Sequence, residues 1–280
     1  MPRFDTSDGL SLHYTDQGDG LPVLCLPGLT RNGDDFQFVL PHLKGVRAIT
    51  LDSRGRGLSE WDGDYMNYSI PREAADVVEL CAFLGLERVV ILGTSRGGLI
   101  AMGLAVTHPQ LLQGVILNDI GPVIDEDGLD RIKDYVGVTP RFPDLETAAQ
   151  AMAKAEAGGE FPNVPLSRWR AHAAAIYRQA DNHVVLRYDP RLGDAMREQA
   201  KAGDFPDLWP FFDALKGKPV AVIRGANSDL LSEATVAEMS RRHGDLVVAT
   251  VPDRGHVPFL DEPEALKAIN AVLESIRVPA

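Results

Sequence analysis

Residues 89–103 read VVILGTSRGGLIAMG, and this stretch decides the fold. The apolar run 88–93 predicts a buried strand, and the apolar residues from 99 onward predict a buried helix. Residues 93–97 are the turn between them and match the pattern G-x-S-x-G. Glycine neighbours let a serine at such a turn adopt a strained conformation above the sheet. A nucleotide-binding turn fits less well, because its patterns require a lysine or G-x-G-x-x-G.

Strand-like and helix-like segments alternate on both sides of this turn. A hairpin around Asp8 and Gly9 opens the chain. Short apolar runs follow at 21–26, 46–51, 88–93, 114–120, 218–225 and 245–251. Helix-like segments lie at 34–43, 70–85, 99–109, 231–244 and 262–276. This alternation predicts an α/β fold with a mostly parallel sheet flanked by helices.

A stretch of about a hundred residues, 121–217, interrupts the alternation and has little strand character. Its clearest helix-like segments are 146–158 and 167–180. Because so long an excursion is too long for a loop in a compact domain, we expect an inserted helical cap over the carboxyl edge of the sheet. Residues 1–120 and 218–280 would then form the core domain.

Composition excludes several classes of function. The chain has 28 Lys and Arg against 40 Asp and Glu, a net charge of −12, which disfavours nucleic-acid binding. No segment approaches the roughly 18 continuous apolar residues of a membrane span, and the N-terminus lacks a signal core. We therefore expect a cytoplasmic protein. Cys25 and Cys81 fall in apolar runs, so neither a structural disulfide nor a metal site is expected.

A serine nucleophile needs a base and an acid that orients the base. Among the seven histidines, only His256 follows the last predicted strand, in a loop at the same edge as Ser95. Three carboxylates end strands: Asp52, Asp119 and Asp229. The chain order nucleophile, acid, base excludes Asp52. We favour Asp229 over Asp119, because it lies one strand before the His256 loop.

The developing oxyanion of acyl transfer requires two N–H donors. The backbone of Arg96, at a helix N-terminus, is one candidate. The backbone of Leu29, in the loop 27–30 after the first apolar run, is the other. No metal or cofactor is implied by these residues.

With these residues placed, the chain resembles the α/β-hydrolase fold family, in its branch with a serine nucleophile. The resemblance rests on LPGLT, LDSRGRGLS, LGTSRGG, RGANSD and RGHVPFLDEP, and covers nearly everything outside the cap. It implies an eight-stranded sheet, a Ser95, Asp229 and His256 triad, an oxyanion hole from Leu29 and Arg96, and no cofactor.

Side chains near the site suggest further roles. The Arg96 guanidinium beside the nucleophile is expected to snorkel or to pair with a carboxylate such as Asp119 or Asp52, rather than to bind substrate. Arg54 and Arg56 are expected to be structural. Thr30 and the cap aromatics are candidates to line a substrate pocket. The aromatics are Trp169, Tyr177, Trp209, Phe211 and Phe212, of which Trp209 and Phe212 are the favoured pair.

The sequence thus predicts a serine hydrolase, carboxylesterase-like, that cleaves small to medium esters through an acyl-enzyme. C–C bond hydrolases, lactonases and acyltransferases use the same machinery and remain alternatives. A small-ligand receptor that retains the triad is an alternative of another class. The partner is a small-molecule ester, and a homodimer is compatible with the sequence, which fixes neither the substrate nor the oligomeric state.

Overall fold

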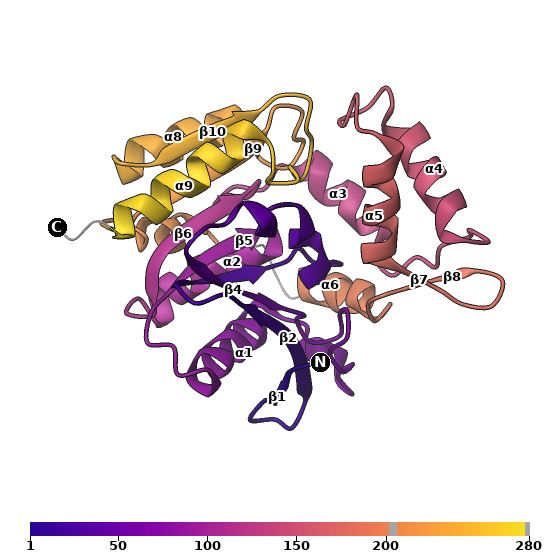
Figure 1. Cartoon of the computed structure of the whole chain (residues 1–280), viewed down its shortest axis with the longest axis horizontal. Coiled ribbons are helices and arrows are strands. Elements are labelled where there is room, and N and C mark those ends of the chain that lie inside the picture. The colour runs from indigo at the N-terminus through magenta and orange to yellow at the C-terminus, as the bar shows by residue number, and fades with distance from the viewer. Residues whose placement is uncertain (202–205, 278–280) are drawn as a thin grey trace.

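The computed structural model describes residues 1–201 and 206–277, and over these residues its main feature is an eight-stranded sheet (Figure 1). The first two strands, β1 and β2, run antiparallel to their neighbours, and the other pairs are parallel. This confirms the predicted mostly parallel sheet. In spatial order the strands are β1 (Arg3–Asp5), β2 (Ser11–Gln17), β4 (Val46–Leu51), β3 (Leu21–Leu26), β5 (Val89–Thr94), β6 (Leu112–Asn118), β9 (Val220–Gly225) and β10 (Val247–Val251).

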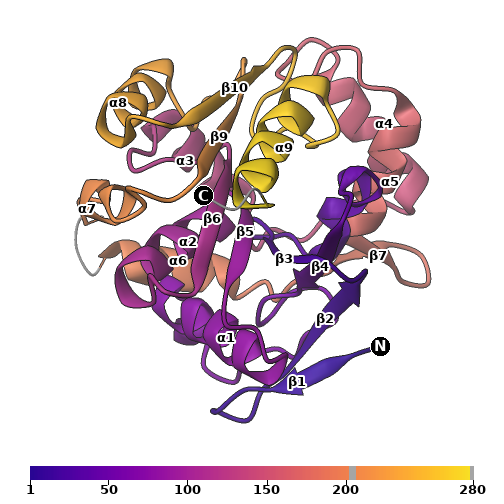
Figure 2. The same cartoon turned by 60° about the vertical axis from the view of Figure 1, so that its left-hand side comes forward.

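Helices cover both faces of the sheet (Figure 2). One face packs against α1 (Ile70–Phe83), α2 (Arg96–Thr107), α7 (Trp209–Asp213) and α8 (Glu233–His243). The other packs against α9 (Pro263–Arg277) and the short 3₁₀ helices η1 (Gly33–Phe38) and η2 (Leu40–His42). The sequence predicted one continuous helix over 34–43. Pro41, which has no N–H and clashes with a preceding helical turn, accounts for the break.

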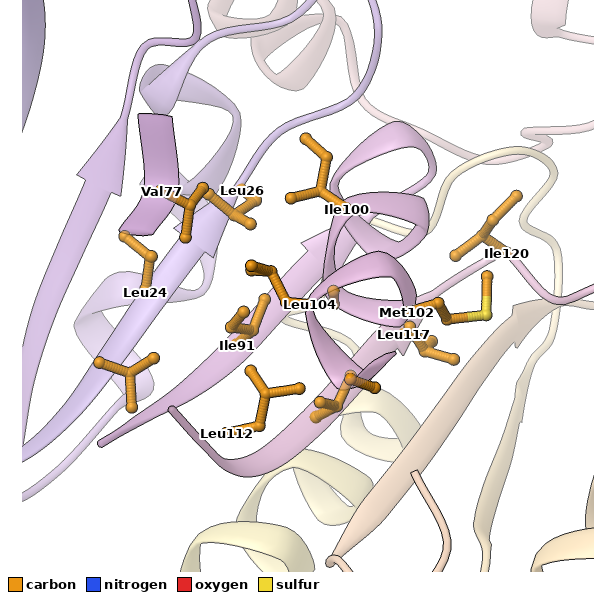
Figure 3. Close-up of a cluster of buried hydrophobic side chains, with 14 of the residues drawn as sticks. Leu24, Leu26, Val77, Ile91, Ile100, Met102, Leu104, Leu112, Leu117 and Ile120 are labelled. Carbon is orange, nitrogen blue, oxygen red and sulfur yellow. The ribbon is translucent and has the colours of Figure 1, made fainter. Parts of the chain in front are cut away.

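Successive strand residues point to opposite faces, which explains why the central strands are apolar throughout. In β3, Leu24 packs into the cluster with α1 and α2, whereas Cys25 packs into the cluster with α9. Figure 3 shows Leu24, Leu26 and Ile91 beside Ile100 and Leu104 of α2. The second cysteine, Cys81, lies in the first cluster, so the sheet separates two buried, free thiols.

The segment between β6 and β9 forms most of one side of the molecule in Figure 1. It contains α3 (Glu126–Tyr135), α4 (Leu145–Glu156), α5 (Leu166–Ile176) and α6 (Leu192–Lys201). The sequence predicted helix through residue 180, but α5 ends at Ile176. The chain then forms a hairpin of β7 (Tyr177–Gln179) and β8 (Val184–Leu186). Helices α4 and α5 share a small core of their own, whereas α7 packs on α2 and α8.

The turn from β5 to α2 tolerates no side chain at Gly97, and this yields a stability prediction. A Cβ at Gly97 would lie 2.1 Å from the carbonyl oxygen of Leu26, while a Cβ at Gly103 would have one neighbour, 4.0 Å away on Ile70. We expect Gly97→Ala to lower the free energy of unfolding by about 3 kcal/mol through overpacking. Gly103→Ala, in the same helix, should raise it by about 0.5–1 kcal/mol. Urea denaturation measures both, and equal midpoints for the two variants would contradict the close approach.

Candidate active site

Ser95 sits at the junction of β5 and α2 in a strained backbone conformation, with φ 48° and ψ −112°. A positive φ is rare for residues other than glycine and costs energy that the surrounding structure must supply. Here the Ser95 N–H donates to the carbonyl of Asn118 at 3.0 Å. The Ser95 carbonyl accepts from Gly98 and Leu99 in the first turn of α2. The predicted nucleophile turn is therefore present, held by β6 on one side and α2 on the other.

His256 lies between Ser95 and a buried carboxylate. Its Nε2 is 3.0 Å from Ser95 Oγ, and its Nδ1 is 2.8 Å from Asp119 Oδ2. An ionised carboxylate can only accept, so the imidazole hydrogen lies on Nδ1 and the Nε2 lone pair faces the serine hydroxyl. This is the tautomer that a general base requires.

Asp119 follows β6 directly and is fully buried. Its Oδ1 accepts from the Gly225 N–H at 2.8 Å, and its Oδ2 accepts from Ser228 Oγ at 2.5 Å as well as from His256. Its backbone has φ 54°, another left-handed conformation outside glycine. Hydrogen bonds from β9 and the loop after it therefore fix this carboxylate under the imidazole.

The prediction that Asp229 is the acid partner of His256 is wrong for this structure. Asp229 Oδ2 instead lies 2.8 Å from Arg131 Nη2 of α3. The same guanidinium pairs with Glu160, whose carboxylate accepts from the His256 backbone N–H. Both aspartates lie at the same sheet edge. Arg131, which belongs to the segment between β6 and β9, forms an ion pair with Asp229, whereas Ser228 and Gly225 hydrogen-bond to Asp119. Asp229 thus helps to hold α3 against the loops of the site.

Leu29 and Arg96, whose backbone N–H groups are the predicted oxyanion donors, line the same cavity as Ser95. Neither group donates to another atom in the backbone hydrogen bonds of residues 1–201 and 206–277. The Arg96 N–H belongs to the first turn of α2, where N–H groups have no intrahelical partner and the helix dipole favours an anion. These two donors remain candidates for an oxyanion hole.

One buried carboxylate, Glu73 of α1, connects the two halves of that donor pair. It accepts from Arg96 Nε at 2.8 Å and Arg96 Nη2 at 2.9 Å, and from Arg56 Nη1 at 2.8 Å. Arg56 Nε in turn donates to the Leu29 carbonyl at 2.9 Å. Burial alone would raise the pKa of Glu73, but the two guanidiniums outweigh it and hold this pKa below its ordinary value.

Arg96 thus pairs with a carboxylate, as predicted, but that carboxylate is Glu73 and neither of the two candidates, Asp119 and Asp52. Asp119 is occupied by His256, and Asp52 hydrogen-bonds to His13 Nδ1 at 3.0 Å. Arg54 is also structural, as predicted, since its fully buried guanidinium pairs with acidic side chains. These are Asp8, Asp62 and Asp76.

Two cavities border the hydrogen-bonded Ser95–His256 pair, one lined by each residue. The first, of about 310 Å³, contains His256 and has an aromatic wall. The second, of about 270 Å³, contains Ser95 and is mostly apolar. Residues of the segment between β6 and β9 line both cavities. The first is lined by Arg31, Phe38, Met152, Phe161, Trp169, His172 and Phe259, among others; the second by Ile70, Leu99, Ile120, Leu129, Leu192 and Leu230, among others.

The favoured pocket residues Trp209 and Phe212 line neither cavity, so that prediction is wrong. The rings of Trp209 and Phe212 pack edge to face at 6.1 Å, and Phe212 is buried in the core between sheet and helices. The reason is that α7 packs against α2 and α8 instead of covering the site. Thr30 is buried and lines a smaller neighbouring cavity. Of the cap aromatics, Trp169 does line the first cavity.

Two kinds of feature are absent from residues 1–201 and 206–277. None of the helices there has the length and apolar character needed to cross a membrane. No group of three or more His, Cys, Asp or Glu side chains is arranged to hold a metal ion.

Comparison with known proteins identifies the family and the fold. The sequence pattern of the Alpha/beta hydrolase family matches residues 23–269, which is most of the chain. The chain belongs to this family. The fold of this α/β hydrolase and the resemblance seen in its sequence are thus confirmed.

Several relatives of this α/β hydrolase carry named activities. The 3-hydroxybutyrate-oligomer hydrolase of Cupriavidus necator is 38% identical over 86% of this chain and 84% of its own. The 2-(acetamidomethylene)succinate hydrolase of Mesorhizobium japonicum is 29% identical over 95% and 92%. A crystal structure of an α/β hydrolase from Novosphingobium aromaticivorans is 38% identical, covers 98% of this chain and 97% of that chain, and superposes with a TM-score of 0.91.

Sequence reasoning missed three residues of the site: Glu73, Arg31 and His172. Glu73 lies in a segment that reads as an ordinary amphipathic helix, and no local pattern marks its burial. Arg31 lies two residues after Leu29, so its position beside the nucleophile could have been noticed. His172 lies in the segment 121–217, and nothing in the sequence pairs it with Arg31.

Removing the charge of Glu73 should destabilise the protein, because the buried guanidinium of Arg56 and the partly buried one of Arg96 would lose their counter-ion. We expect Glu73→Gln to lower the free energy of unfolding by about 3–5 kcal/mol. Glu79→Gln is the matched control in the same helix. Glu79 is partly exposed and pairs with Arg72, so its loss should cost about 1 kcal/mol or less. Urea denaturation at pH 7 compares the two variants. A Glu73→Gln midpoint as high as that of Glu79→Gln would contradict the role of Glu73 as the carboxylate that joins Arg96 to Arg56.

Proposed function

We propose that this α/β hydrolase cleaves carboxylic esters, with Ser95 as nucleophile, His256 as general base and Asp119 as the acid that orients it. The observation that carries the proposal is the continuous hydrogen-bonded line from Ser95 Oγ through His256 to Asp119, with distances of 3.0 and 2.8 Å. A hydroxyl with a base on one side and a buried carboxylate behind that base is the arrangement of nucleophilic acyl transfer.

In the first half-reaction, Ser95 Oγ attacks the ester carbonyl carbon and its proton passes to His256 Nε2. The carbonyl oxygen becomes an oxyanion that the Leu29 and Arg96 N–H groups can bind. Collapse breaks the bond to the alcohol oxygen, which receives the proton from Nε2. The alcohol leaves, and the acyl group remains on Ser95.

In the second half-reaction, water gives a proton to His256 Nε2 as its oxygen attacks the acyl carbon. The bond to Ser95 Oγ then breaks, Oγ takes the proton back, and the carboxylic acid departs. Asp119 stays ionised throughout and stabilises the imidazolium through Nδ1.

The insertion, residues 121–217, acts in this proposal as a cap that supplies the walls of the substrate site. Support comes from the two cavities, since α4 and α5 contribute Met152 and Trp169 to the first, and α3 and α6 contribute Leu129 and Leu192 to the second. Such a cap excludes water and determines which esters fit.

Two aspartate variants test the assignment of the acid. We expect Asp119→Asn to lower kcat for 4-nitrophenyl butanoate by about three to four orders of magnitude, because the imidazole loses the partner that sets its tautomer. Asp229→Asn is the matched control at the same sheet edge and should stay within about tenfold, since it only loosens an ion pair. The opposite ranking would overturn the assignment of Asp119.

Covalent labelling tests the nucleophile separately. A fluorophosphonate probe should label the wild type at Ser95, as read by peptide mass spectrometry, and Ser95→Ala should neither label nor turn over ester. A wild type that hydrolyses no ester and resists the probe would favour the receptor function instead.

A further inference from the structure

The first cavity contains a cation close to the nucleophile. Among the described residues that line it, Arg31 is the only lysine or arginine. A Cβ at Gly28 would lie 3.5 Å from Arg31 Cγ and 3.8 Å from Ser95 Cβ, so the two side chains flank the same glycine. Arg31 thus extends from the oxyanion loop into the space beside His256.

The hydrogen bond that orients Arg31 is made with a neutral side chain. Arg31 Nη1 donates to His172 Nε2 at 2.9 Å. Because arginine can only donate, His172 accepts with a ring lone pair and is neutral. Burial, with a smaller contribution from Arg31, lowers the pKa of His172 well below its ordinary value, which agrees with that tautomer. His172 therefore positions the guanidinium without acting as its counter-ion.

Two carboxyl groups also line this cavity, Asp35 and Glu156. Asp35 Oδ1 forms an ion pair with Arg31 Nη1 at 3.7 Å, beyond hydrogen-bond distance, and so approaches the guanidinium at the nitrogen that already donates to His172. Glu156 accepts from the Glu160 N–H. Arg31 Nε and Nη2 make no hydrogen bond within residues 1–201 and 206–277, and the side chain is 22% exposed. Two adjacent donors of a guanidinium are thus free to bind a carboxylate in the bidentate manner.

The proposed mechanism determines which half of an ester enters this cavity. The alcohol oxygen receives its proton from His256 Nε2, so the alcohol half must lie on the side of His256. His256 lines the cavity that contains Arg31, whereas Ser95 and both oxyanion donors line the apolar cavity. The acyl chain therefore fits the second cavity, which is mostly apolar, and the alcohol half fits the first cavity, which contains Arg31.

We propose that Arg31 binds a carboxylate carried by the alcohol half of the substrate, so that the preferred substrates are esters of hydroxy acids whose own carboxylate is free. The proposal rests on the proposed ester hydrolysis and adds to it the chemical class of the leaving group. The acyl half needs no charge, because the cavity that receives it is mostly apolar.

Two matched pairs of esters test the proposal on the wild-type protein. The first pair is 3-(butanoyloxy)butanoate and its primary amide, which differ only in the charge on the alcohol half. The second is butyl hydrogen succinate and its primary amide, which differ in the charge on the acyl half. We expect kcat/KM, measured by pH-stat, to favour the carboxylate by about ten- to a hundredfold in the first pair and not in the second.

Variants assign the preference to Arg31. Arg31→Gln should bring the ratio of kcat/KM in the first pair close to one, and Arg31→Lys should retain part of it. Arg170→Gln is the matched control, because Arg170 lies on α5 near His172 but pairs with Glu146 on the surface. Arg170→Gln should keep the wild-type ratio.

Three results would overturn the proposal: a ratio near one in the wild type, a preference confined to the second pair, or a ratio that survives Arg31→Gln. Hydrolysis of neutral 4-nitrophenyl butanoate separates these from failure of the proposed function. If the wild type hydrolyses that ester through Ser95 but shows no preference in the first pair, only the role of Arg31 is wrong. If it hydrolyses no ester, the proposed function and this proposal are both wrong.

Discussion

The close approach of backbone to backbone at the turn from β5 to α2 is the constraint on which the site depends. A Cβ at Gly93 would lie 2.6 Å from the Gly97 carbonyl, and one at Gly97 would lie 2.1 Å from the carbonyl oxygen of Leu26. With no side chains there, α2 starts directly against β3 and β5. Ser95 can then keep a backbone conformation that few residues adopt, and its hydroxyl reaches His256.

The buried carboxylate of Glu73 stabilises the segments around that turn. Glu73 holds Arg96 of α2 and Arg56 of the loop after β4, and Arg56 holds the Leu29 carbonyl. One carboxylate on α1 therefore couples the two segments that carry the candidate oxyanion donors. Breaking a buried ion pair leaves an uncompensated charge and is costly, so these contacts hold both segments in a fixed geometry relative to Ser95.

The space around Ser95 and His256 is asymmetric, and the asymmetry comes from the insertion as much as from the sheet. Aromatic side chains of the insertion, Phe161 and Trp169, pack with Phe259 from the loop of His256. Arg131 of α3 pairs with Asp229 in the loop after β9, and also with Glu160, which accepts from the His256 N–H in the loop after β10. The segment that lines both cavities is thus also bound to the loop that carries His256.

The sequence by itself determined the alternation of strands and helices, the turn at Ser95 and the loop position of His256. These depend on local patterns: continuous apolar runs, glycines at a sharp turn, and a histidine after the last strand. Only the tertiary structure decided between Asp119 and Asp229. Both follow strands that end at the same edge, and their distance along the chain says nothing about which carboxylate turns toward the imidazole. That choice depends on Ser228 and Gly225, which hold Asp119, and on Arg131, which comes from the insertion and holds Asp229.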